Sequence, residues 1–100
     1  MRRNKPIPNA ADDLEKAQSI ALTALVFLAE DALRLSRFLT LTGIGPETLR
    51  AGADQAQTLA AVLDHLLGDE SLLLVFSASK AVPAEAVAPA RALLAKAAGA

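Results

Sequence analysis

His65 is the residue best suited to acid–base chemistry in this 100-residue sequence. It is the only histidine, and a histidine side chain has an ordinary pKa near neutrality. With Asp64 beside it, His65 could act as a general base. The sequence has no cysteine and no second histidine that could serve as a metal ligand or a proton relay. We therefore predict a half-exposed, structural role for His65.

Two acidic pairs, Glu30-Asp31 and Asp69-Glu70, are candidate ligands for a cation. A calcium loop needs several oxygen ligands at alternate positions together with a glycine turn, and neither pair has this arrangement. Acidic residues also cap helix N-termini, where they face the positive end of the helix dipole. We predict that both pairs cap helices and that the chain holds no metal and no cofactor.

The turn Gly43-Ile44-Gly45-Pro46 is the sharpest candidate for a binding site. It is similar to the hairpin of helix-hairpin-helix proteins, in which the N–H groups of a Gly-apolar-Gly turn bind a nucleic-acid phosphate. The chain departs from that pattern at three positions. Glu47 stands where the family has a basic residue, Leu49 where it has a small alanine, and Gly52 where it has an apolar side chain. A helix that ends at glycine, followed by one that starts at proline, explains the turn without a ligand.

The charge distribution bears on the same question. Arg2, Arg3 and Lys5 lie within the first five residues, whereas the rest of the chain has seven basic and eleven acidic residues. An acidic body opposes a broad phosphate-binding surface, because nucleic-acid affinity depends largely on basic side chains. Weak binding through Gly43, Ile44 and Gly45, helped by this basic arm, is therefore the alternative function, and binding to nucleic acid is not our main expectation.

Motifs for other chemistry are missing from the sequence. There is no Gly-x-Ser-x-Gly nucleophile turn, no phosphate-binding loop and no dinucleotide fingerprint. An enzymatic interpretation would depend on His65 and the acidic pairs alone. We predict that the protein is not an enzyme.

The basic start of the chain does not predict export or membrane insertion. Asp12, Asp13, Glu15 and Lys16 separate the basic start from the apolar run Ile20–Leu28, whereas a signal peptide needs apolar residues directly after its basic start. The run is also shorter than the roughly 20 residues that cross a membrane. We expect a cytoplasmic protein with no membrane partner.

The composition predicts an all-α fold. Apolar residues make up 53% of the sequence and are mostly Ala and Leu, which are strong helix formers, whereas only three residues are aromatic. One hundred residues form one domain with a modest core. We predict a flexible basic arm over residues 1–10 and a compact bundle of five or six short helices over residues 11–100.

Capping and turn residues divide this bundle. The first helix runs to about Ala29 and is apolar on all sides, which predicts that it is buried at the centre of the fold. Further helices are expected over residues 32–42, from Pro46, after Asp54, over residues 70–80, and from Pro83 with a kink or new start at Pro89. Leu72–Phe76 is a short continuous apolar run, which also fits a buried strand, although helix is favoured.

The chain also resembles itself at a spacing of 39 residues. Ala17-Gln18-Ser19-Ile20-Ala21 returns as Ala56-Gln57-Thr58-Leu59-Ala60, and later residues correspond when one position is dropped, so that Phe38 matches Phe76. Such a repeat predicts two related halves, residues 12–50 and 51–98, that stack on each other. The alternative is chance similarity in a chain rich in Ala and Leu. We further predict that Leu25 and Leu63 occupy equivalent buried places.

Three segments resemble a small bacterial family of domains of unknown function, numbered 3572. They are Phe27–Asp31 with Arg37–Arg50, Val62–Glu70, and Pro83-x-Glu85-x-Val87, and the resemblance covers roughly residues 14–95. These motifs consist mostly of packing and turn residues. The resemblance implies a small helical domain and supplies no activity, ligand or site residue.

The composition favours a function in protein–protein interaction. Apolar side chains are abundant for a domain of this size, and some are expected on the surface of the helices over residues 32–42 and 70–80. We predict either a homodimer or a small accessory partner of another protein.

Overall fold

A computed structural model describes residues 10–99 of the chain. All regular structure within these residues is helical, which confirms the predicted all-α fold. The elements are α1 (Ala10–Ala29), α2 (Ala32–Thr42), α3 (Pro46–Ala51), α4 (Ala56–Leu67), α5 (Glu70–Lys80), a 3₁₀ turn η1 (Ala84–Ala86) and α6 (Val87–Gly99). Leu72–Phe76 is therefore helix and not strand. The predicted arm lies outside the described residues, apart from Ala10, which begins α1.

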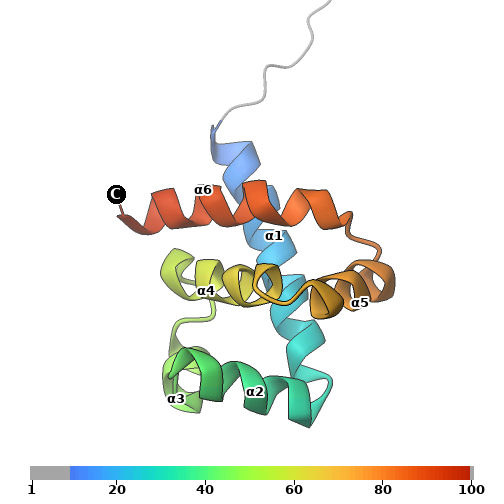
Figure 1. The fold of residues 1–100 in the computed structure, drawn as a ribbon. Helices are drawn as coiled ribbons and strands as arrows, with labels where there is room; N and C mark the ends of the chain where they lie inside the picture. The colour runs from blue at the N-terminus through green and yellow to red at the C-terminus, as the bar shows by residue number, and fades with distance from the viewer. Residues whose placement is uncertain (1–9, 100) are drawn as a thin grey trace, which may run out of the picture.

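The first helix is the axis of the bundle. In Figure 1, α1 runs the length of the helical body, and α6, α4 and α2 lie across it one below another. The helices α4 and α6 also pack on each other, and α5 contacts both α1 and α4. The order along the chain thus brings the last helix back onto the first.

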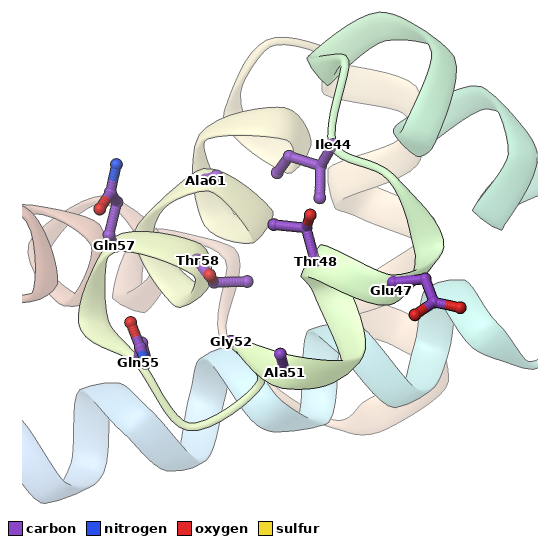
Figure 2. A pocket seen from close by; sticks show the side chains of 9 residues that line it. All are labelled: Ile44, Glu47, Thr48, Ala51, Gly52, Gln55, Gln57, Thr58 and Ala61. Atoms are coloured by element: carbon purple, nitrogen blue, oxygen red, sulfur yellow. The ribbon is translucent and has the colours of Figure 1, made fainter.

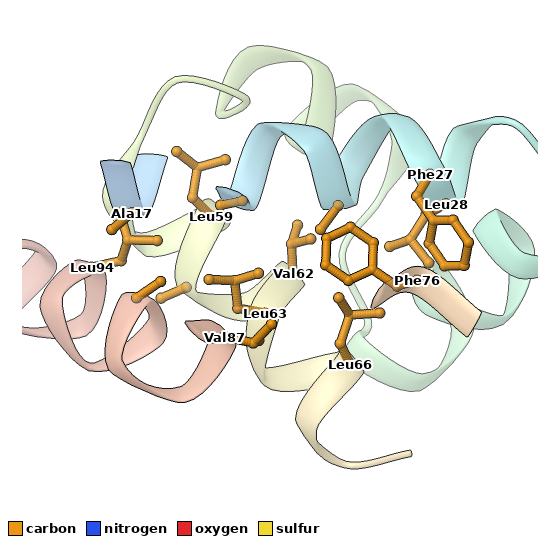
Figure 3. Packing of buried hydrophobic residues seen from close by; sticks show 14 of the residues in the cluster. Ala17, Phe27, Leu28, Leu59, Val62, Leu63, Leu66, Phe76, Val87 and Leu94 are labelled. Carbon is orange, nitrogen blue, oxygen red and sulfur yellow. The ribbon is translucent and has the colours of Figure 1, made fainter. Parts of the chain in front are cut away.

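The core lies where α1, α4 and α6 meet (Figure 3). All three phenylalanines are fully buried, and the other fully buried large side chains are Leu28, Leu59, Leu63, Leu66, Leu94, Val62 and Val87. The face that α1 contributes to this core also has three small residues, Ala17, Ala21 and Ala24, which are at most 2% exposed. Small side chains at a helix crossing allow the two backbones to approach, and they explain how two helices fit against α1.

The prediction that α1 is buried on all sides is wrong. Leu22 is 43% exposed and Val26 is 53% exposed, because α2, α4, α5 and α6 leave one face of α1 uncovered. Leu25 is only partly buried, so it does not match the fully buried Leu63. The residue 39 positions before Leu63 is Ala24, and Ala24 is the fully buried one.

The helices α2 and α5 correspond at a spacing of 38 residues. Asp31 and Asp69 are the N-caps of α2 and α5, each helix has 11 residues, and each ends at a left-handed residue, Gly43 (φ 75°) or Ala81 (φ 56°). Phe38 and Phe76 are the buried residues of the two helices. The sequence comparison predicts a change of spacing from 39 to 38 residues after the acidic pairs. In the structure the spacing is already 38 at the N-caps, because Asp31 corresponds to Asp69 and not to Glu70.

Two predicted helix starts differ from the structure. Asp54 does not cap α4, because the helix begins one residue later, with Gln55 as an N-cap that makes no side-chain capping bond. Pro83 precedes the 3₁₀ turn η1, and α6 begins at Val87. Pro89 is then the third residue of α6, within the first turn, where its missing N–H has no carbonyl partner to lose.

Candidate functional site

The Gly43–Pro46 turn has the predicted backbone but few N–H groups for a phosphate. Gly43 ends α2 in the left-handed conformation, Gly45 is the N-cap of α3, and Pro46 begins that helix. The N–H of Gly43 donates to the carbonyl of Leu39 at 2.9 Å, and the N–H of Ile44 donates to Thr42 Oγ1 at 3.3 Å. Two of the N–H groups that the phosphate would need are therefore already bonded.

The helix behind this turn is also a poor anion site. It has only six residues, so its dipole is small, and Glu47 lies in its first turn, where it would repel a phosphate. The basic residues expected to assist, Arg2, Arg3 and Lys5, lie outside the described residues. The geometry of Gly43, Ile44 and Gly45 thus agrees with a capping role.

Gly52 has a packing role that the helix-hairpin-helix comparison did not reveal. A Cβ at this position would collide with Thr58 Oγ1 of α4 and would lie 3.2 Å from the carbonyl oxygen of Thr48. Glycine therefore lets the end of α3 approach α4. Between these helices lies an open groove of about 610 Å³, lined by Thr48, Thr58, Gln55, Gln57, Glu47, Ile44, Ala51, Gly52 and Ala61 (Figure 2). Its lining is mostly uncharged and has no titratable group besides Glu47.

His65 is placed as a partly buried packing residue of α4. Its imidazole meets the ring of Phe38 edge to face, with the ring centroids 5.2 Å apart. Burial lowers the pKa of His65 below its ordinary value of 6.5, the Asp69 carboxylate opposes this shift, and the Arg37 guanidinium adds to it. The imidazole thus helps to join α2 to α4. His65 shares a surface depression with Asp64, Asp69 and Ser71, but within residues 10–99 no hydrogen bond joins its imidazole to any of these side chains.

The prediction that both acidic pairs cap helices is confirmed for Asp31 and Asp69 and is wrong for Glu30. Asp31 Oδ1 accepts hydrogen bonds from the N–H groups of Leu33 and Arg34, at 2.9 and 3.1 Å. Asp69 Oδ1 accepts one from Leu72 at 3.1 Å. Glu30 does not cap a helix; its Oε2 lies 2.7 Å from Lys80 Nζ and links α1 to α5. Within residues 10–99, no group of three or more acidic or histidine side chains is arranged to hold a metal ion.

The uncovered face of α1 is the feature that the sequence prediction missed. We call Ser19, Leu22, Val26 and Ala29 the α1 outer face; all four side chains are exposed, and they are spaced three, four and three residues apart. A shallow depression follows it between Glu15 and Val26. No Asp, Glu, Lys or Arg occurs from Ala17 to Ala29, a run that fits a fully covered helix as well as one with an uncovered face.

The other exposed apolar side chains lie on α2 and α5, the helices for which the sequence predicts apolar residues at the surface. Leu33 and Leu41 lie eight residues apart on α2, with the exposed Arg37 between them. On α5, Leu74 and Val75 form a second uncharged face together with the exposed Ser71 and Ala78. The α1 outer face differs in lying on a helix of 20 residues, whereas α2 and α5 have 11 each.

No single helix within residues 10–99 is long and apolar enough to cross a membrane. By length and composition α5 together with Ala84–Gly99 could, but this pair is bent by 109°.

Comparison with known proteins identifies the family. The family model described as "Protein of unknown function (DUF3572)" matches residues 14–97. No curated protein and no solved structure gives a significant match. Because the match covers most of the chain and takes in all or most of each helix, this protein belongs to the DUF3572 family.

Proposed function

We propose that this protein is a protein-binding domain and that its partner covers the α1 outer face. The observation that supports the proposal is the uncharged surface of a long helix, with Leu22 and Val26 about half exposed at its centre. Single exposed apolar residues are common on proteins and need no explanation. A continuous apolar stripe without charge marks an interaction site, because binding removes it from water.

The dimensions of α1 fit this role. Its 20 residues extend over about 30 Å, which is long enough for a helix of a partner to lie along it. The flanks supply a polar rim, with Glu15 and Lys16 near one end and Glu30 near the other. An apolar centre with a polar rim is the usual anatomy of a protein interface.

A pair of matched variants tests the proposal. Val26→Glu places a carboxylate in the α1 outer face, and Val75→Glu makes the same change on α5, where the native side chain has a similar exposure of 49%. The tagged wild-type chain and both variants would be purified from native cells, with bound proteins identified by mass spectrometry. Each candidate partner would then be purified and titrated calorimetrically against the three chains.

We expect Val26→Glu to weaken binding at least tenfold, because the complex would bury an unpaired charge. Val75→Glu should bind like the wild type. Both variants should keep the helical circular-dichroism spectrum, since neither native side chain is in the core. A purified partner that binds Val26→Glu as tightly as the wild type would contradict the proposal.

A further inference from the structure

We propose that the partner at the α1 outer face is a second copy of this chain, bound with its α1 antiparallel to the first. This inference rests on the proposed function and specifies the occupant of the same surface. It follows from the spacing of the exposed residues and from the charges beside them.

The spacing suits the pairing of two helices. The four residues of the α1 outer face, Ser19, Leu22, Val26 and Ala29, follow one another at intervals of three, four and three. This alternation is the heptad pattern by which one helix packs against another. In a two-fold dimer the same stripe must match itself, and small residues flanking a Leu–Val centre allow that.

The charges beside the stripe determine its orientation. Lys16 and Glu30 are both exposed and lie on the same flank of α1, the flank that faces α5 and α6. In an antiparallel pair, equal flanks of the two helices meet, with their directions reversed. Lys16 of each copy then approaches Glu30 of the other, so the dimer gains two such contacts.

A parallel pair lacks these contacts. It would set the flank of Lys16 and Glu30 against the opposite flank of the other copy, which has the uncharged Gln18 and Leu25. The existing ion pair does not block the antiparallel contact. Lys80 approaches Oε2 of Glu30, so the second carboxylate oxygen can accept from Lys16 of the other copy.

The antiparallel register follows from the stripe. Leu22 of each copy lies against Val26 of the other, and Ser19 lies against Ala29. One pair of helices buries less than the roughly 800 Å² per partner of a standard interface, so the dimer should be weak and form at micromolar concentration.

Disulfide trapping tests the occupant and the orientation together, because the chain has no native cysteine. The variants Ser19→Cys and Ala29→Cys would be oxidised separately and as an equal mixture, after one of them is mass-labelled. In the antiparallel dimer the mixture should rapidly form a disulfide between position 19 of one copy and position 29 of the other. Each variant oxidised alone should cross-link slowly. Identical cysteines would be offset by ten residues, or about 15 Å along the helix, which is too far for a disulfide.

Ala88→Cys, an exposed position on α6, measures the background from random collisions. Sedimentation equilibrium should show a dimer for the wild type and a monomer for Val26→Glu, and Lys16→Glu should weaken the dimer more than Lys16→Arg does. Equal cross-linking of the single variants would indicate a parallel pair and overturn the proposal. A wild-type monomer at high micromolar concentration, with trapping no faster than for Ala88→Cys, would also overturn it. Binding of a different protein that is sensitive to Val26→Glu would then still support the proposed function.

Discussion

The rings of Phe27 and Phe76 meet edge to face, with their centroids 5.4 Å apart and their planes inclined by 64°. The guanidinium of Arg34 lies over the same Phe27 ring, 4.1 Å from its centroid, and Arg34 Nη1 donates to the Phe27 carbonyl at 3.0 Å. Phe27 of α1 is thus held between α2 and α5. It is the point at which two helix hairpins, α1–α2 and α4–α5, are joined in the core.

Truncating Phe76 should therefore destabilise the whole bundle. Phe76→Ala removes the edge-to-face contact and leaves a cavity beside Phe27, which should lower the free energy of unfolding by about 3–5 kcal/mol. Urea denaturation followed by circular dichroism measures this change. Phe76→Leu fills most of the space and should cost clearly less; equal losses for the two variants would contradict this account of the site.

Leu63 and Leu25 provide a second contrast. Leu63 is fully buried, so Leu63→Ala should lower the free energy of unfolding by about 2–5 kcal/mol. Leu25 is partly buried at the edge of the core, and Leu25→Ala should cost clearly less. Thermal unfolding of both variants under one condition measures the difference. A larger loss for Leu25→Ala would mean that the core is centred on the other side of α1.

The two left-handed helix ends should respond oppositely to substitution. Ala81 has φ 56°, a conformation that costs an alanine about 1 kcal/mol, so Ala81→Gly should stabilise the protein by roughly 0.5–1 kcal/mol. Gly43→Ala should destabilise it by about 1 kcal/mol through the backbone alone, since a Cβ there meets no atom within 4 Å. Chemical denaturation of the two variants tests the pair, and a gain from Gly43→Ala would refute it.

Stability should fall as His65 becomes protonated in the unfolded chain. Burial lowers the pKa of His65 in the folded state, so protons bind preferentially to the unfolded state, whose pKa is near 6.5. The His65 contribution is therefore complete above pH 6.5 and declines as the pH falls from 6.5 to the folded pKa. Denaturation midpoints measured from pH 7.5 to 5 should show this decline. His65→Gln should flatten it, whereas an unchanged slope would assign the effect to other groups.

Nucleic-acid binding, the alternative that the sequence raised, should be weak and independent of base sequence. The Gly43 and Ile44 N–H groups are already bonded, so any affinity should depend on Arg2, Arg3 and Lys5. Fluorescence anisotropy with duplex and single-stranded oligonucleotides at physiological salt tests this, using the full chain and one lacking residues 1–5. Submicromolar binding that survives the deletion would make the glycine turn a phosphate site.

Local signals predicted the hairpins well, because their ends depend on residues close in sequence. The starts of α2 and α5 follow from their aspartate caps, Asp31 and Asp69, and the end of α2 follows from Gly43. The faces of α1 could not be predicted in this way. Apolar residues surround that helix, so its buried side depends on where α4 and α6 cross it, and the crossing selects Ala24 over the larger Leu25.

The α1 outer face could not be predicted from the sequence either, because it too depends on where the other helices cross α1. Hydrophobic periodicity alone cannot distinguish a helix covered on all sides from one that keeps an uncovered apolar stripe. The charge-free run from Ala17 to Ala29 fits both, and only the placement of the other helices resolves them.

The return of α6 onto α1 and α4 has a consequence for how the protein is made. Val87, Ala90 and Leu94 complete a core whose other walls are synthesised first. On the ribosome, the two hairpins can form from neighbouring residues as they emerge, but their shared apolar surface stays open until residues 87–99 leave the exit tunnel. Nascent chains stalled before residue 87 should therefore bind chaperones, and chains in which α6 has left the exit tunnel should bind them no longer.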